Sequence, residues 1–170
     1  ASAVQMQSNM AATLNIDWIT DRVAEAAGLF GPAPDRRQAL RALDARVLEA
    51  TPGAALNHPY IHEAGGRGPF VASDARAMLT GLSTRTRLLD LVRAVYEGLA
   101  MAGRDCYAAM GHVPDEIRVA GGAARSRSFK RIMASVLGTP LRESSREEAG
   151  AAGAAMMAAV AIGAFPDMAA

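Results

Sequence analysis

Residues 118–138 read RVAGGAARSRSFKRIMASVLG, and the pattern of this stretch changes at its two glycines. Before them, residues 116–120 alternate in polarity, which predicts a strand. After them, apolar residues recur at steps of three and four until Gly138, which predicts a helix. Such a strand, glycine turn and helix point backbone N–H groups and the positive end of a helix dipole at a bound anion. A turn without a ligand has the same spacing, so the residues alone leave both interpretations open.

The segments around this stretch are mostly helical in their spacing. The clearest follows Thr86, where apolar residues repeat from Leu89 to Met110 and predict a helix over about 87–110 that ends at Gly111. A short strand is expected over residues 140–143. We expect further helices over about 13–27, from a cap at Asp35 to Thr51, and over about 147–163, with a loop over 57–71.

The closing helix contains the apolar run AGAAGAAMMAAVAIGAF at residues 149–165. Alanine and glycine dominate the run, which favours a buried helix over a membrane span. Gly103 on the long helix and Gly150 and Gly153 on the closing helix would let two backbones approach closely. The sequence therefore predicts that these two helices pack together beside a small sheet.

The composition fits a single helix-rich domain. The 170 residues are 51% hydrophobic but only 5% aromatic, and the net charge of +1 gives no argument for nucleic acid or a membrane as partner. A single cysteine, Cys106, and the absence of a secretory leader favour the cytoplasm. The chain opens without an initiator methionine, so we expect a piece of a longer protein.

Several motifs for other functions are absent or weak. No phosphate-binding G-x-x-x-x-G-K-[ST] string exists, and the glycines at 121 and 122 do not fit the Rossmann pattern G-x-G-x-x-G. His58 and His62 have metal-ligand spacing, but Pro59 argues against the helix that would aim both at one ion. The basic residues of 125–131 are better explained as a solvated helix start than as a nucleic-acid site.

Five strings together resemble the FGGY carbohydrate kinases, which include xylulose, ribulose and glycerol kinases. In the order of that family, they are PYIHEAGGRGP, DARAMLTGL, RAVYEG, VAGGAARSRSFKRIMASVLGTPL and EEAGAAGAAMMAAVAIG. The resemblance implies an α/β fold: residues 1–170 would be part of the C-terminal actin-like, ribonuclease-H-like ATPase domain. The N-terminal sugar-binding domain and the catalytic aspartate would lie outside this chain. Gly66 replaces a glutamate of the family's G-E-R-x-P loop, which puts a role for that acid in doubt.

The resemblance also implies a nucleotide site. Gly121 and Gly122 would contact the adenosine part of ATP, Ser126 would face the base, and Thr13 and Asp17 would line the site. The implied function is an ATP- and Mg²⁺-dependent kinase for a sugar or polyol, with this chain supplying the adenosine side, no catalytic residue and no metal ligand. It implies no nucleic acid or membrane partner and leaves homo-oligomerisation open. The alternatives are a non-catalytic actin-like nucleotide-binding module and a Rossmann-type binding domain.

Overall fold

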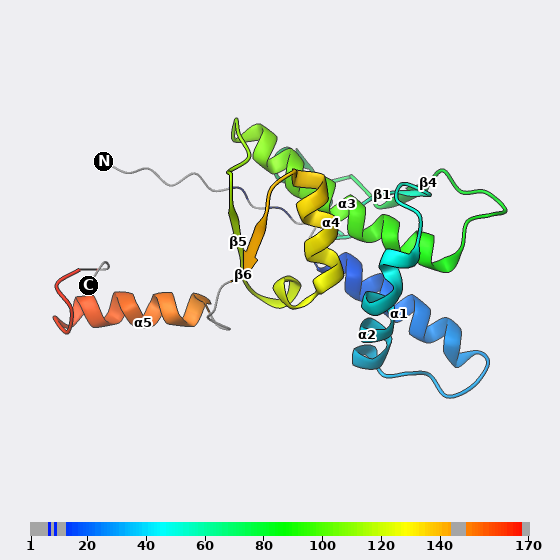
Figure 1. Ribbon diagram of the computed structural model, residues 1–170, viewed down its shortest axis with the longest axis horizontal. Helices are drawn as coiled ribbons and strands as arrows, with labels where there is room; N and C mark the ends of the chain where they lie inside the picture. The colour runs from blue at the N-terminus through cyan, green and yellow to red at the C-terminus, as the bar shows by residue number, and fades with distance from the viewer. Residues whose placement is uncertain (1–6, 8, 10–12, 144–148, 168–170) are drawn as a thin grey trace.

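The computed structural model describes residues 7, 9, 13–143 and 149–167, and these fold around one long helix (Figure 1). The helices are α1 (Leu14–Gly28), α2 (Arg36–Arg46), α3 (Leu88–Ala109), α4 (Arg127–Leu137) and α5 (Ala149–Ala161), with short 3-10 turns η1 (Val47–Glu49) and η2 (Gly122–Arg125). The strands are β1 (Leu56–His58), β2 (Gly66–Arg67), β3 (Val71–Ala72), β4 (Met78–Thr80), β5 (Ile117–Val119) and β6 (Leu141–Glu143). The predicted helices over 13–27 and 87–110 are confirmed to within a residue.

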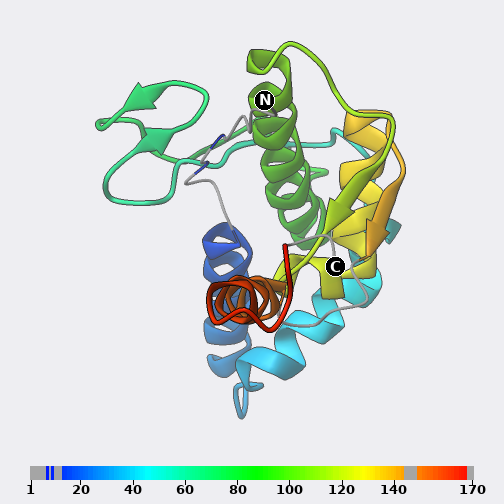
Figure 2. The ribbon, with the colours of Figure 1, turned by 90° about the vertical axis from the view of Figure 1, so that its left-hand side faces the viewer.

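The hydrophobic core lies along α3. Val92, Val95 and Tyr96 of this helix are at most 1% exposed, and Leu99 and Ala100 follow one turn later in the same cluster. Apolar side chains of α1, α2, η1 and α4 pack on this row, so that α1 and α2 cover one part of α3 and α4 another (Figures 1 and 2). The apolar period of α3 thus fixes where the neighbouring helices lie.

The helix ends follow the predicted capping residues. Asp35 Oδ1 accepts a hydrogen bond from the Gln38 amide at 2.8 Å, and Gln38 Oε1 accepts one from the Asp35 amide at 3.2 Å, which forms a reciprocal capping box on α2. The cap predicted at Asp35 is confirmed. Helix α4 ends at Gly138 with a φ of 67°, in the left-handed conformation that glycine adopts without steric cost.

In the part of the chain that the structure describes, three small sheets of two strands each accompany the helices. Strands β5 and β6 are parallel, with Ile117 opposite Leu141, and α4 connects them. Both strands were predicted. The pairs β1–β4 and β2–β3 are antiparallel, so the segment predicted as a loop over 57–71 carries short strands instead. Strands β2 and β3, with two residues each, are too short to show a period of two in the sequence.

The packing predicted for the closing helix is wrong. Helix α5 exists, but none of its described side chains is buried, and it extends away from the other helices (Figure 1). A Cβ added at Gly150 or Gly153 would have no neighbouring atom within 4 Å, whereas one at Gly103 would lie 3.0 Å from Cε of Met133. Gly103 therefore permits a close approach between α3 and α4. The composition of α5 indicated an apolar environment but could not indicate which surface would supply it.

A helix that spans a membrane needs about 20 consecutive, mostly apolar residues. None of the described helices is both long enough and apolar enough to cross a bilayer, and α5 itself has only 13 residues.

Candidate functional site

A pocket of about 490 Å³ lies between the start of α1, helix α2 and the turn before α4. Its volume falls in the range of small-molecule sites in proteins. The structure brings four of the five residues predicted for the nucleotide site to its wall, while Gly121 lies beside the pocket and not in its lining. The lining consists of Thr13, Ile16, Asp17, Leu40, Arg41, Asp44, Ala45, Tyr96, Gly122, Arg125 and Ser126.

The two glycines after β5 have different structural roles. Gly121 has a φ of 80°, and its carbonyl accepts a hydrogen bond from the Ala124 amide at 3.1 Å, so this residue makes the turn. Gly122 does not have a positive φ, and a Cβ added to it would meet no atom within 4 Å. Gly122 therefore leaves one wall of the pocket open where any side chain would project.

Ser126 joins the start of α4 to helix α2. As the N-cap of α4, its Oγ accepts a hydrogen bond from the Phe129 amide at 2.9 Å. The same hydroxyl donates to Oδ1 of Asp44, and the Ser128 hydroxyl donates to the backbone carbonyl of Asp44 at 2.6 Å. Two hydrogen bonds to one residue of α2 therefore set the position of the glycine turn relative to that helix.

Tyr96 forms part of the floor of the pocket. Only 1% of this residue is exposed, and its ring packs edge-on against Phe129 with the ring centroids 6.0 Å apart. Burial, and then the nearby carboxylate of Asp44, raise the pKa of Tyr96 well above its ordinary value. The carboxylate of Asp44 thus accepts from the hydroxyl of Ser126 and acts electrostatically on that of Tyr96.

Asp44 was not predicted as a site residue. The signal that could have found it is its spacing, since it lies four residues after Leu40 and next to Leu43, on the inward stripe of α2. An acid on such a stripe needs a polar partner. Its partner Ser126 lies 82 residues away, and no local pattern reveals it.

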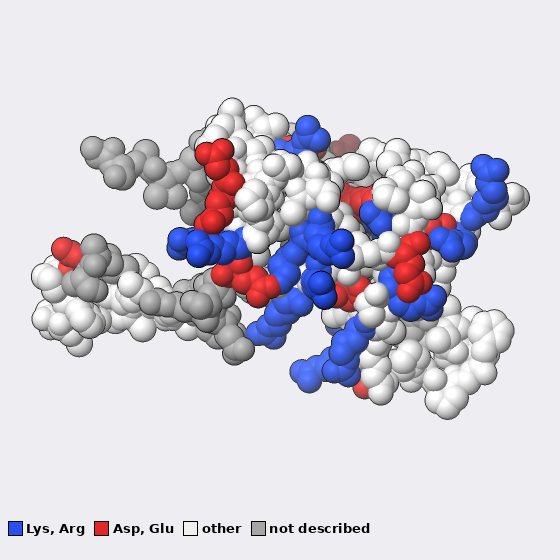
Figure 3. All heavy atoms as spheres, viewed as in Figure 1, with Lys and Arg blue, Asp and Glu red and all other residues white. Residues whose placement is uncertain are grey.

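The pocket combines an apolar floor with charged groups at its walls. Ile16 and Leu40 are apolar, Asp17 and Asp44 supply carboxylates, and the exposed Arg41 and Arg125 supply guanidinium groups. Basic side chains gather over the part of this face where α2 and α4 lie (Figure 3). A planar, polar molecule with an anionic tail fits such a lining.

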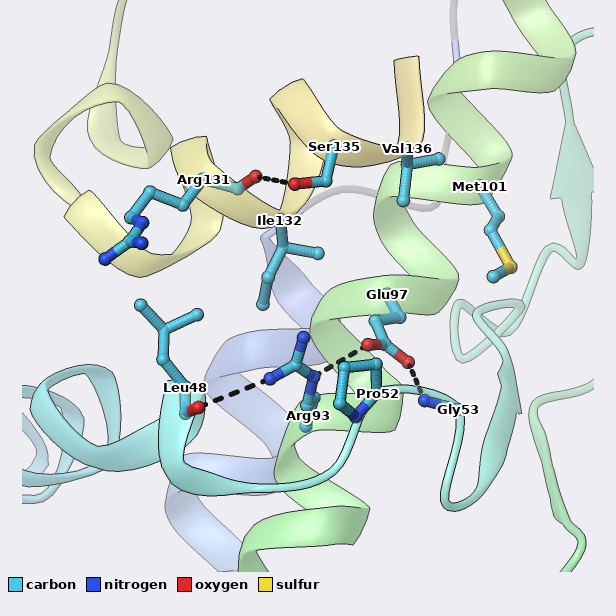
Figure 4. A pocket seen from close by; sticks show the side chains of 10 residues that line it. All are labelled: Leu48, Pro52, Gly53, Arg93, Glu97, Met101, Arg131, Ile132, Ser135 and Val136. Atoms are coloured by element: carbon cyan, nitrogen blue, oxygen red, sulfur yellow. Dashed lines mark hydrogen bonds and ion pairs between the residues drawn. The ribbon is translucent and has the colours of Figure 1, made fainter. Parts of the chain in front are cut away.

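A second cavity, of about 610 Å³, contains a nearly buried ion pair of α3 (Figure 4). Arg93 Nε donates to Glu97 Oε1 at 2.7 Å and Arg93 Nη1 donates to the Ala50 carbonyl at 2.8 Å. Glu97 Oε2 accepts from the Gly53 amide at 3.0 Å. Both charged groups therefore hold the segment after η1 against α3, which is a structural use of their hydrogen bonds.

Among the described residues, no group of three or more His, Cys, Asp or Glu side chains is arranged to hold a metal ion. His62 Nδ1 accepts a hydrogen bond from the Ala64 amide at 3.0 Å, a local turn contact. Cys106 is buried on α3, and burial raises the pKa of its thiol, as expected for a core cysteine. The pocket between α1, α2 and α4 is therefore the candidate binding site.

Comparison with known proteins gives one family. The chain matches the model of the FGGY family of carbohydrate kinases, C-terminal domain, over residues 2–162. It is 54% identical over 164 residues to the erythritol kinase of Brucella abortus (strain 2308), a match that covers 96% of this chain and 32% of that protein. The chain therefore spans about a third of the length of that curated relative.

Solved structures with the same fold include other kinases. The xylulose kinase from Rhodospirillum rubrum superposes with a TM-score of 0.72 at 31% identity, covering 90% of this chain and 30% of that one. The Plasmodium falciparum glycerol kinase with ADP superposes with a TM-score of 0.62 at 22% identity, covering 75% of this chain and 26% of that one. At 22% identity, the match to the Plasmodium falciparum glycerol kinase shows a shared fold.

Proposed function

The chain belongs to the FGGY family of carbohydrate kinases, and from that premise we propose that it forms the adenosine side of the ATP site of such a kinase. The full-length protein would transfer the γ-phosphate of ATP to a hydroxyl group of a sugar or polyol. The observation that carries this proposal is the pocket onto which the glycine turn opens, because Thr13, Asp17, Gly122 and Ser126 all line it.

The lining supports a nucleoside in two ways. The apolar side chains of Ile16, Leu40 and Tyr96 form a floor on which a planar base can lie. Gly122 leaves backbone uncovered, so that a ligand can approach the start of α4, where the amide groups and the helix dipole favour negative charge. The role of this chain is thus to bind and orient the nucleotide.

In this proposal, residues outside this chain carry out the chemical step. Phosphoryl transfer depends on positioning and on electrostatic stabilisation of the phosphates, with a base that accepts the proton of the attacking hydroxyl. Mg²⁺ would be held by the phosphates of the nucleotide, by waters and by one or two carboxylates, as is usual for this ion. A well-held adenosine fixes where the γ-phosphate lies relative to the acceptor.

The acceptor in our proposal is a short polyol. The 54% identity to a protein named erythritol kinase supports erythritol more than the longer sugars of the xylulose kinases. A coupled assay of ADP release by the full-length protein, with erythritol, glycerol and D-xylulose in parallel, tests this choice. ATP binding without turnover of any sugar or polyol would instead favour a non-catalytic nucleotide-binding module.

Replacing Gly122 by Val tests the site itself. In the full-length protein we expect the KM for ATP to rise about tenfold or more, because the side chain fills the open wall of the pocket, while the KM for the polyol stays within about twofold. The matched control is Gly31→Val, since a Cβ at Gly31 also meets no atom within 4 Å but lies in a loop away from the pocket. An unchanged KM for ATP in a folded Gly122→Val protein would contradict the proposal.

A further inference from the structure

The hydroxyl of Ser126 has no proton left for a ligand. A serine hydroxyl carries one proton, and Ser126 donates it to Oδ1 of Asp44. Its oxygen already accepts from the Phe129 amide at 2.9 Å, which leaves one lone pair. Towards a ligand at this end of the pocket, Ser126 is therefore no donor and only a neutral, weak acceptor.

The carboxylate of Asp44 is the charged acceptor at that end. A carboxylate offers about four lone-pair positions, and the hydroxyl of Ser126 takes one of them, on Oδ1. Asp44 lines the pocket and is only partly buried, so it also presents acceptor capacity to a ligand. The hydroxyl of Ser126, itself fixed as the N-cap of α4, holds the carboxylate in place.

We propose that Asp44 selects the base of the nucleotide by accepting a hydrogen bond from the 6-amino group of adenine. This inference rests on the proposed function of the pocket as the adenosine site. It makes Asp44 a residue that determines the specificity for adenine nucleotides and gives Ser126 the role of positioning it.

The group at position 6 of the purine determines which base Asp44 prefers. Adenine carries an amino donor at position 6, whereas hypoxanthine and guanine carry a carbonyl oxygen there. Two acceptors that face each other repel, and a site built to bond one group discriminates against an analogue that lacks it. Hypoxanthine and guanine also have an N1–H donor, but it lies one ring position away, so the base must shift within the pocket to bring it to the same carboxylate oxygen.

The variant Asp44→Asn reverses the preference in this account. The amide oxygen of Asn can still accept from Ser126, so the fold of the pocket is retained. Its amino group then replaces the second carboxylate oxygen and donates to a carbonyl at position 6 of the base. Inosine nucleotides should therefore bind more tightly to this variant than to the unmodified protein, and adenosine nucleotides should bind less tightly.

The experiment compares MgATP with MgITP in the full-length protein, by kcat/KM with the polyol, and MgADP with MgIDP by calorimetric Kd. In the unmodified protein we expect a preference for the adenine nucleotide of about 10-fold to 100-fold, the size of a hydrogen bond to a charged group. In Asp44→Asn the ratio should fall to about one or below, mainly through KM. Asp17→Asn removes the same charge from another wall of the pocket and should leave the ratio unchanged.

The outcomes distinguish the role of Asp44 from the proposed function of the pocket. Equal Kd values for MgADP and MgIDP in the unmodified protein would overturn the role of Asp44, and this measurement needs no variant to fold. So would an adenine preference that is undiminished in a folded Asp44→Asn protein. A protein that binds neither nucleotide would contradict the proposed function itself, and the role of Asp44 with it.

Discussion

Tyr96 shows how one side chain serves both the core and the pocket. Its ring packs against Phe129 in the core, and the same residue lines the pocket together with Asp44. Its pKa is raised, chiefly because burial disfavours the charged phenolate. The native state therefore keeps this proton at a pH where the unfolded chain has lost it.

This difference predicts how stability depends on alkaline pH. Because the pKa of Tyr96 is higher in the folded than in the unfolded state, its contribution is complete below the unfolded pKa of about 10 and declines as the pH rises above it. Tyr96→Phe should cost about 1 kcal/mol at pH 7, because it removes the buried hydroxyl near Asp44, and lose less stability than the unmodified protein above about pH 10. Urea denaturation at both pH values measures the two differences, and parallel losses in both proteins would show this interpretation to be wrong.

At single positions the sequence predicted the site only in part. Gly122 could be identified because the order of strand, glycines and helix is local, and the resemblance to FGGY kinases added Ser126, Thr13 and Asp17. Asp44 could not, because its role depends on the hydroxyl of Ser126 at the start of α4. Contacts between distant segments have no signature in the spacing of one segment.

Helices were predicted more accurately than strands. The helix at 88–109 has an apolar stripe six turns long, and Gly138 ends α4 as expected. Strands β2 and β3 have two residues each, so their pairing depends on the turn between them and leaves no period. Two residues cannot show a repeat, so the sequence could not identify these two strands.

The capping box of α2 gives a prediction at the scale of a helix. Asp35→Ala removes the acceptor for the Gln38 amide and should lower the free energy of unfolding by about 1 kcal/mol. Asp115→Ala removes the same side chain from an exposed position between α3 and β5 and should change it by less than about half a kcal/mol. Chemical denaturation compares the two, and equal effects would rule out a role for the cap in stability.

At the scale of the whole molecule, α5 differs most from the expectation. Its residues 149–161 include no charged side chain, yet the described ones are exposed or half-exposed. The sequence predicted that the helix exists and that it is apolar throughout. It could not predict its packing, because an apolar composition without an amphipathic stripe indicates no particular face.

Two glycine variants distinguish the observed arrangement from the expected one. In the 170-residue chain, Gly153→Leu should leave the denaturation midpoint unchanged or raise it slightly, because the site is open and leucine favours a helix more than glycine. Gly103→Leu should destabilise by about 1 to 3 kcal/mol, because Met133 must move away from α3. A larger loss of stability from Gly153→Leu than from Gly103→Leu would instead indicate that the closing helix packs against the long helix.

The central claim is that the pocket between α1, α2 and α4 holds the adenosine of ATP. The most direct measurement is the position of MgADP in crystals of the full-length protein. We expect the base on the floor formed by Ile16, Leu40 and Tyr96, with its 6-amino group about 3 Å from the carboxylate of Asp44. Density for the nucleotide elsewhere, such as the cavity of Arg93 and Glu97, with this pocket empty, would contradict the claim.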